Sequence, residues 1–102
     1  MIAIPSGASI FLCTTATDMR KSFDGLSGLV RSEFSREPHD GSLFLFINRR
    51  RDRIKILYWE VGGFALWYKR LESGSFETVT GRRGESIVTI DATELSMLLS
   101  GE

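Results

Sequence analysis

The residues of this sequence best suited to chemistry are a run of arginines near its middle. Arg49, Arg50 and Arg51 are consecutive, and Arg53 follows after a single acid, Asp52. Adjacent guanidinium groups repel one another, and the planar guanidinium suits bidentate contact with a phosphate group. The run therefore predicts an anion-binding loop whose contacts with nucleic-acid phosphates weaken as salt rises. The alternative is a solvated turn whose charge only keeps the protein soluble.

Further basic residues surround this run, although the whole chain has thirteen basic and thirteen acidic residues and no net charge. Residues 47–71 hold seven basic residues against two acids, so the charge is segregated along the chain. Segregated positive charge is typical of surfaces that bind polyanions. The predicted phosphate contacts are Arg49, Arg50, Arg51, Arg53, Lys55, Lys69 and Arg70, with Arg20 and Lys21 extending the patch.

Aromatic residues are interleaved with these cations. The same stretch contains both tryptophans and both tyrosines of the chain: Tyr58, Trp59, Trp67 and Tyr68. Such rings can stack on unpaired bases, but they also supply large apolar areas to a protein core. We expect core packing for at least half of them.

Catalytic machinery is not evident in the sequence. One histidine, His39, and one cysteine, Cys13, provide no ligand spacing for a tetrahedral zinc site. No base for a nucleophilic serine and no phosphate-cradling glycine loop can be recognised. Asp18, Asp24 and Glu60 could together hold two metal ions for phosphoryl transfer, but helix-start and helix-surface roles are favoured for the two aspartates. We therefore expect neither an enzyme nor a bound cofactor.

The size and composition are those of one soluble domain covering residues 1–102. Cys13 lies in an apolar run, so a buried thiol is expected, and a lone cysteine excludes an internal disulfide. The N-terminus lacks the basic lead and apolar stretch of a signal peptide, and no apolar run is long enough to span a bilayer. These features predict a protein of the reducing cytoplasm.

Periodicity and turn residues predict the secondary structure. Short apolar or β-branched runs predict strands at 10–14, 43–48, 54–60, 64–71 and 87–90. Apolar residues at helical spacing predict a helix from about 18 to 36. Asp91 and Glu94 form a capping pattern that begins a second, short helix. Residues 76–79 could add a short edge strand before a polar loop at 80–86.

A hairpin joins the strands at 54–60 and 64–71. If Gly62 and Gly63 form its two-residue turn, Glu60 lies opposite Ala65, and Lys55 lies opposite Arg70. Two like charges would then face each other beside the arginine run, where they destabilise the sheet unless an anion or a carboxylate joins them.

The predicted fold class is α+β: a mainly antiparallel sheet of four to five strands packed against one long helix. The run of consecutive hairpins favours helices segregated onto such a sheet. We expect the long helix on one face and the short C-terminal helix at an edge or end.

Four long segments of the chain resemble a known family. They are TDMRKSFDGL at 17–26, LFLFINRRRDRIKILYWE at 43–60, GGFALWYKRLESGSF at 62–76 and ELSMLL at 94–99. Together they resemble the TnpB-type accessory protein, the product of the second reading frame, in the IS66 group of bacterial insertion sequences. The resemblance covers nearly the whole chain, in the same order and spacing.

The resemblance implies a small protein that assists a separate transposase and has no recombinase active site of its own. The family's recognisable segments correspond here to residues 18–21 and 49–53. Two places depart from the family pattern: Glu77, Thr78 and Val79 stand where members often carry Trp-Pro, and members tend to continue past the terminal leucines.

We therefore expect a transposition accessory that binds the DNA of the element ends and acts with the element's transposase. A second copy of the chain could pair with an exposed sheet edge. The alternative is an adaptor whose basic loop docks on an acidic surface of the transposase without contacting DNA.

Overall fold

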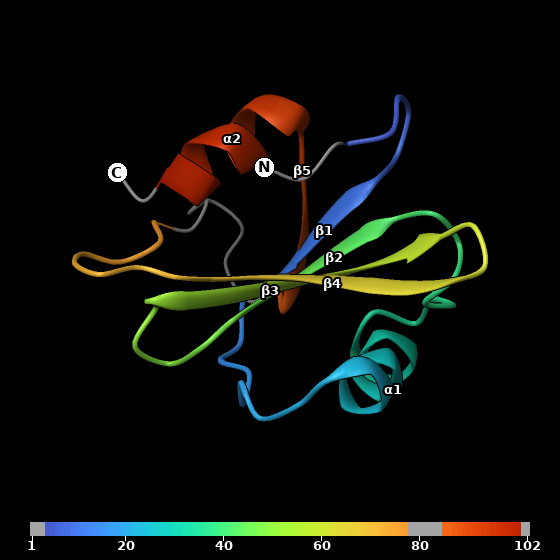
Figure 1. The fold of residues 1–102 in the computed structure, drawn as a ribbon, viewed down its shortest axis with the longest axis horizontal. Coiled ribbons are helices and arrows are strands. Elements are labelled where there is room, and N and C mark those ends of the chain that lie inside the picture. Colours follow the sequence, from blue (N-terminus) through green and yellow to red (C-terminus); the bar gives the residue numbers. More distant parts are fainter. Residues whose placement is uncertain (1–3, 78–84, 101–102) are drawn as a thin grey trace.

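The computed structural model describes residues 4–77 and 85–100 and contains a five-stranded sheet with a helix on each face (Figure 1). The elements follow in the order β1 (Ile10–Cys13), α1 (Phe23–Glu33), β2 (Leu43–Ile47), β3 (Arg53–Glu60), β4 (Gly63–Arg70), β5 (Ile87–Ile90) and α2 (Ala92–Ser100). The strand order is β4-β3-β2-β1-β5, and only β1 and β2 run parallel. The α+β class and the predicted strands, each within one residue at either end, are confirmed.

Successive side chains of the central strands point to opposite faces of the sheet, so the protein has two apolar cores. In β1 and β2 every residue is buried, as expected for strands covered on both faces. Phe11, Phe44 and Phe46 pack with Leu26 and Val30 of α1. The connection from β1 to its parallel neighbour β2 must cross over the sheet, and α1 lies within that crossover.

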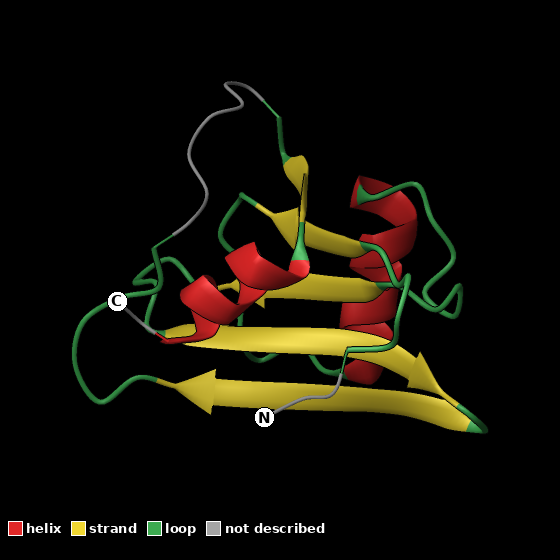
Figure 2. Ribbon diagram, turned by 90° about the horizontal axis from the view of Figure 1, so that it is seen from above, coloured by secondary structure: helices red, strands yellow, loops and turns green. Residues whose placement is uncertain are grey.

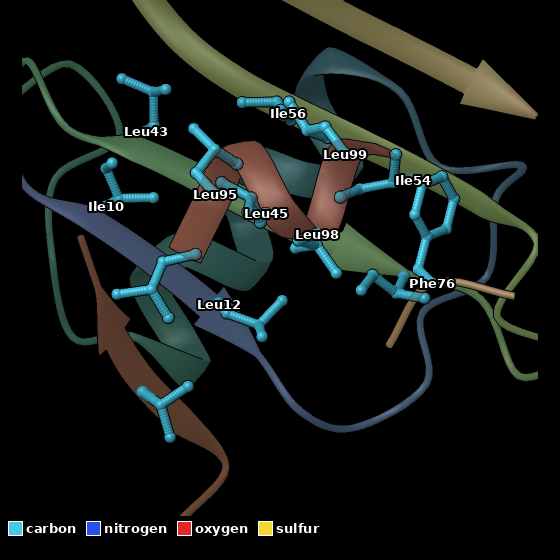
Figure 3. Packing of buried hydrophobic residues seen from close by; sticks show 13 residues of the cluster. Ile10, Leu12, Leu43, Leu45, Ile54, Ile56, Phe76, Leu95, Leu98 and Leu99 are labelled. Carbon is cyan, nitrogen blue, oxygen red and sulfur yellow. The ribbon is translucent and has the colours of Figure 1, made fainter. Parts of the chain in front are cut away.

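The C-terminal helix covers the second face rather than an edge or end of the sheet, so that expectation was wrong (Figure 2). Leu95, Leu98 and Leu99 recur at helical spacing and form one apolar stripe. The sheet face opposite α1 offers a matching surface, and Figure 3 shows these leucines packed over Leu45 and Ile54. Two apolar sheet faces need two covers, and α2 supplies the second.

Helix α1 is shorter than predicted, because it begins at Phe23 instead of residue 18. Asp18 forms a local turn in which its side chain accepts the N–H of Arg20 at 2.9 Å. At the other end Ser35 adopts a left-handed conformation, with φ of 54°, and the N–H of Arg36 donates back to the carbonyl of Val30. Both ends are thus set by local hydrogen bonds that compete with further helix.

The hairpin register differs from the prediction by two residues. The turn consists of Val61 and Gly62, where Gly62 has φ of +93°, and Glu60 lies opposite Gly63. At the other end Arg53, not Lys55, lies opposite Arg70. A shift of two residues in strand pairing keeps every side chain on its predicted face of the sheet. Two like charges therefore do face each other, but the residue opposite Arg70 is Arg53 instead of Lys55.

The strand proposed at 76–79 is not present in its described part. Phe76 and Glu77 belong to a loop, and Phe76 is fully buried in the core beneath α2. The rest of that strand, and residues 80–84 of the predicted loop, lie outside the described residues.

Candidate nucleic-acid interface

Three segments meet at one end of the sheet, and they carry the basic residues predicted from the sequence. They are residues 17–21, which follow β1, residues 48–55, and residues 69–71; we call them the basic end. Hydrogen bonds join them: the ammonium of Lys55 donates to the carbonyl of Met19 at 2.7 Å, and the N–H of Leu71 donates to the carbonyl of Asp52 at 2.8 Å. In Figure 1 this end lies on the left, away from the Val61–Gly62 turn.

The basic end is strongly charged. Its three segments contain nine basic residues and two acids, Asp18 and Asp52, which leaves a surplus of seven. Three more carboxylates, those of Glu72, Glu77 and Glu85, belong to adjoining exposed segments. The positive charge is therefore densest at the arginine loop, residues 48–52, and declines toward these neighbours.

Asn48 holds the arginine loop in shape. Its side-chain carbonyl accepts the N–H groups of Asp52 and Arg53 at 3.1 and 3.0 Å, and its amide donates to the Asp52 carboxylate at 2.7 Å. This amide hydrogen bond is the main cause that lowers the pKa of Asp52. Asn48 was not among the site residues predicted from the sequence, although an Asn that follows a strand is typical of turns in which its side chain bonds nearby backbone.

Arg51 is part of the loop framework. Its backbone has φ of 61°, and its N–H donates to the carbonyl of Asn48 at 3.1 Å. Its Nε donates to the carbonyl of Phe76 at 3.1 Å, while the N–H of Phe76 returns a bond of 2.6 Å to the carbonyl of Arg51. Because Phe76 is anchored in the core, these bonds fix the loop against the rest of the protein.

Four arginines are arranged around this framework. Arg49 and Arg50 are exposed at the tip of the loop. Arg53 and Arg70 lie opposite each other on β3 and β4, on the α1 side of the sheet. Arg53 is half-buried and contacts the hydroxyl of Tyr68 at 3.4 Å, whereas Arg70 is exposed. Among the described residues no carboxylate forms a salt bridge with Arg49, Arg50 or Arg70.

The two predicted lysines have internal roles. Lys55 is only 6% exposed, and its ammonium donates to the carbonyls of Met19 and Lys21, both at 2.7 Å. It also lies 4.9 Å from the centre of the Tyr68 ring. On the other face, the ammonium of Lys69 donates to the carbonyl of Leu99, at the end of α2, at 2.8 Å. Both ammonium groups are held away from the outer surface of the arginine loop.

Arg20 and Lys21 extend the basic end as predicted, and both are exposed. Arg20 forms a bidentate pair with Asp18, with the closest approach at 2.7 Å. The side-chain hydrogen bond from Arg20, helped by its backbone N–H, lowers the pKa of Asp18 to about 2. The charge on Arg20 is thereby offset by the neighbouring carboxylate of Asp18, whereas no described carboxylate forms a salt bridge with Arg49.

The aromatic residues are mainly structural. Tyr58 and Trp67 pack against the core beneath α2. The Trp59 ring makes edge-to-face contacts with the rings of Phe64 and His39, with ring centres 5.0 and 6.2 Å apart. These contacts lie at the end of β3 that is far from the arginine loop. Tyr68, which is 49% exposed, adjoins the basic end, where Lys55 lies over its ring and Arg53 contacts its hydroxyl.

The remaining sequence-predicted groups form no reactive cluster. Cys13 is buried, as expected. Within residues 4–77 and 85–100, no three histidine, cysteine or acidic side chains come together as metal ligands. No helix in these ranges has the length and apolar character needed to cross a membrane.

Comparison with known proteins identifies relatives of the chain. A family model described as IS66 Orf2 like protein matches residues 8–102. Two uncharacterized proteins of Sinorhizobium fredii, y4jC and y4hO, are each 34% identical to this chain. The matches cover 99% and 96% of this chain, and 85% of each relative. No solved structure matches the chain.

Proposed function

This chain belongs to the IS66 Orf2-like family of accessory proteins of insertion-sequence transposition, and we propose that it acts by binding DNA through the basic end. The duplex ends of the element are the target, and the element's transposase is the partner that acts there. In this proposal the protein works in the cytoplasm, where the DNA is, and supplies contacts instead of catalysis.

The observation that carries the proposal is the exposure of Arg49 and Arg50 on a loop whose backbone is held by hydrogen bonds. Asn48 and Phe76 fix the loop backbone, so little conformational entropy is lost when the two guanidinium groups engage phosphates. Further cations border the loop and would contact the DNA backbone on either side of it: Arg53, Arg70, Arg20 and Lys21. Lys55 and Lys69 drop out of the proposed contact set because their ammonium groups already bind carbonyls.

The test is a fluorescence anisotropy titration with a duplex that carries the element's terminal repeat and with a scrambled duplex, at two salt concentrations. For Arg49→Ala/Arg50→Ala we expect about a ten-fold loss of affinity and a salt slope smaller by about 1.8, because two phosphate contacts are lost. The charge-matched control is Arg31→Ala/Arg36→Ala, which removes two arginines near the opposite end of the sheet. Equal affinities for the two double variants, or binding that does not weaken with salt, would contradict DNA binding by this loop.

A second candidate function is a protein adaptor that docks on the transposase without contacting DNA. The exposed apolar residues at the far end of the hairpin favour it: Trp59 is 41% exposed, and Val61 at the turn is fully exposed. Capture of purified transposase that survives nuclease treatment, together with no shift of free duplex, would support the adaptor. Loss of capture on nuclease treatment would instead indicate that the two proteins are held together by binding the same DNA molecule.

A further inference from the structure

A pocket of about 260 Å³ lies at the basic end, where the parallel strands β1 and β2 both finish. One wall comes from the end of β1 and the residues after it, and the other from the end of β2 and the arginine loop. The lining residues are Cys13, Thr14, Ala16, Ile47, Asn48, Arg49 and Arg51.

The topology explains why the pocket is there. After Cys13 the chain turns toward α1, and after Ile47 it turns away into the arginine loop. The two paths separate beyond the last paired residues and are joined again at Thr17, whose N–H donates to the carbonyl of Ile47. Crevices at the carboxyl ends of neighbouring parallel strands, where the following segments diverge, are the usual ligand sites of open α/β sheets.

The residues that line the pocket suit an anion better than the hydrogen-bonding edge of a nucleic-acid base. Cys13, Ala16 and Ile47 are apolar or weakly polar. The hydroxyl of Thr14 already donates to the carbonyl of Glu85 at 2.7 Å, and the side chain of Asn48 is engaged within its loop. These polar groups are committed to the fold, so they offer little for reading the pattern of a base.

The charge of the pocket comes from Arg49, which is exposed beside it, and from Arg51. Among the described residues that line the pocket there is no carboxylate. An anion entering the pocket would be attracted by the exposed Arg49, at a site partly shielded from water, where electrostatic attraction is stronger than on an open surface.

We propose that this pocket receives one phosphate group of the bound DNA, together with part of its sugar. The inference rests on the proposed function and makes it more specific, because it names the point where the backbone is held. The phosphate could belong to the internal backbone or to a 5′-terminal phosphate of a DNA end, and the experiment separates these two sources.

A reporter thiol at the pocket tests the proposal. Ala16 is exposed and lines the pocket, so Ala16→Cys in a Cys13→Ala background places one reactive thiol there. The matched control, Ala92→Cys in the same background, places a thiol at an exposed alanine at the start of α2. The alkylation rate by iodoacetamide is measured alone, with inorganic phosphate, with a 5′-hydroxyl duplex and with the same duplex carrying 5′-phosphates.

We expect duplex at ten times its dissociation constant to slow alkylation at position 16 about ten-fold, since about nine sites in ten are then occupied. The control thiol should change less than about two-fold under the same mass-action conditions. Equal protection by the two duplexes assigns an internal phosphate, and protection only by the 5′-phosphorylated duplex assigns a terminal one.

Anisotropy in the same samples separates the possible failures. Bound duplex with an unprotected thiol at position 16 overturns the pocket and leaves DNA binding in place. Protection by inorganic phosphate without any duplex binding supports the pocket as a phosphate site and overturns the proposed function. Neither binding nor protection overturns both.

A second variant tests the pocket without a thiol. Ala16→Phe fills the space and should weaken duplex binding about five-fold, through loss of a phosphate contact. Ala92→Phe, the same substitution at the start of α2 and outside the pocket, should leave binding unchanged. Wild-type affinity in a folded Ala16→Phe protein would overturn the inference.

Discussion

Two groups of cations occupy the basic end, and the protein uses them in opposite ways. Lys55 and Lys69 lie on the two faces of the β3–β4 hairpin and bind backbone carbonyls, one at the turn before α1 and the other at the end of α2. Arg49 and Arg50 lie at the loop tip, where no described carboxylate forms a salt bridge with them. The lysines hold the fold together, and the arginines are available to a ligand.

The difference follows from the chemistry of the two side chains. A lysine presents a compact ammonium on a long flexible stem, which can reach several carbonyls through a confined space. An arginine presents a wide planar fork that suits a phosphate at an open surface. Substitutions should therefore separate stability from binding, and four predictions test whether they do.

The largest effect on stability is expected for Lys55→Met. The change keeps most of the apolar stem but leaves the carbonyls of Met19 and Lys21 without their donor, which should cost about 3 kcal/mol. Urea denaturation followed by circular dichroism measures the loss. Lys21→Met, the same replacement at an exposed lysine, is the control and should stay within about 0.5 kcal/mol of wild type. Similar stabilities for the two variants would show that the hydrogen bonds of the buried Lys55 ammonium add nothing to the free energy of unfolding.

Asn48→Ala should have the next largest effect and should disturb stability and binding together. The variant loses two acceptor contacts and one donor contact in the arginine loop, a cost of about 2 kcal/mol. DNA affinity should also fall, because Arg49 and Arg50 lose their fixed backbone. Asn48→Asp retains the acceptor for the Asp52 and Arg53 N–H groups but replaces the amide donor with a carboxylate that repels the carboxylate of Asp52, so it should also lower stability. An Asn48→Ala protein with wild-type affinity would mean that the loop shape is irrelevant to binding.

Arg70→Gln should shift stability and binding in opposite directions. It removes a like charge opposite Arg53, so the protein should gain about 0.5 kcal/mol of stability at low salt. The gain should disappear in about 1 M salt, where charges on the surface are screened. DNA affinity should fall at the same time. A stability gain that persists at high salt would point to a cause other than charge repulsion.

The smallest effect concerns Asp18 and its dependence on pH. The folded pKa of about 2 lies below the ordinary value of 3.8, so the pairing with Arg20 stabilises the protein above about pH 4. This contribution is lost as the pH falls from 4 toward 2. In Arg20→Gln the Asp18 pKa, followed by NMR, should rise toward its ordinary value. An unchanged pKa would show that the bidentate pair does not form in solution.

The sequence was sufficient for the strands because their signal is local. Continuous apolar runs at 10–13 and 43–47 need burial on both faces, which only a central position in a sheet provides. The hairpin register was harder, because Gly62 and Gly63 fit a turn equally well by composition. The structure uses Val61 and Gly62 instead, so a single positive φ suffices. The prediction that residues 1–102 form one domain stays a prediction.

The sequence predicted which basic residues would cluster, but not the different contacts that the structure gives the lysines and the arginines; that this cluster is a binding site stays a prediction. Lys55 and Lys69 look like surface charge in the sequence, because their acceptors lie 34 and 30 residues or more away along the chain. The true start of α1 was missed for the same reason, since Lys55 binds the carbonyls of the turn that precedes it. Arg49 and Arg50 needed no distant partner, and their exposure follows from the run of charge alone.

The pairing of β5 with β1 has a consequence for the order of folding. Ile10 lies opposite Ile90, 80 residues further along the chain, whereas the most distant pair in the β3–β4 hairpin, Arg53 and Arg70, is separated by 17. Contacts that are close in sequence form faster, and a chain folds as it leaves the ribosome. The hairpin and the arginine loop can therefore assemble on the nascent chain, while β1 waits with an unpaired edge. Thr14, which bonds to Glu85 and Ser86, takes its final place only after the last strand has been made.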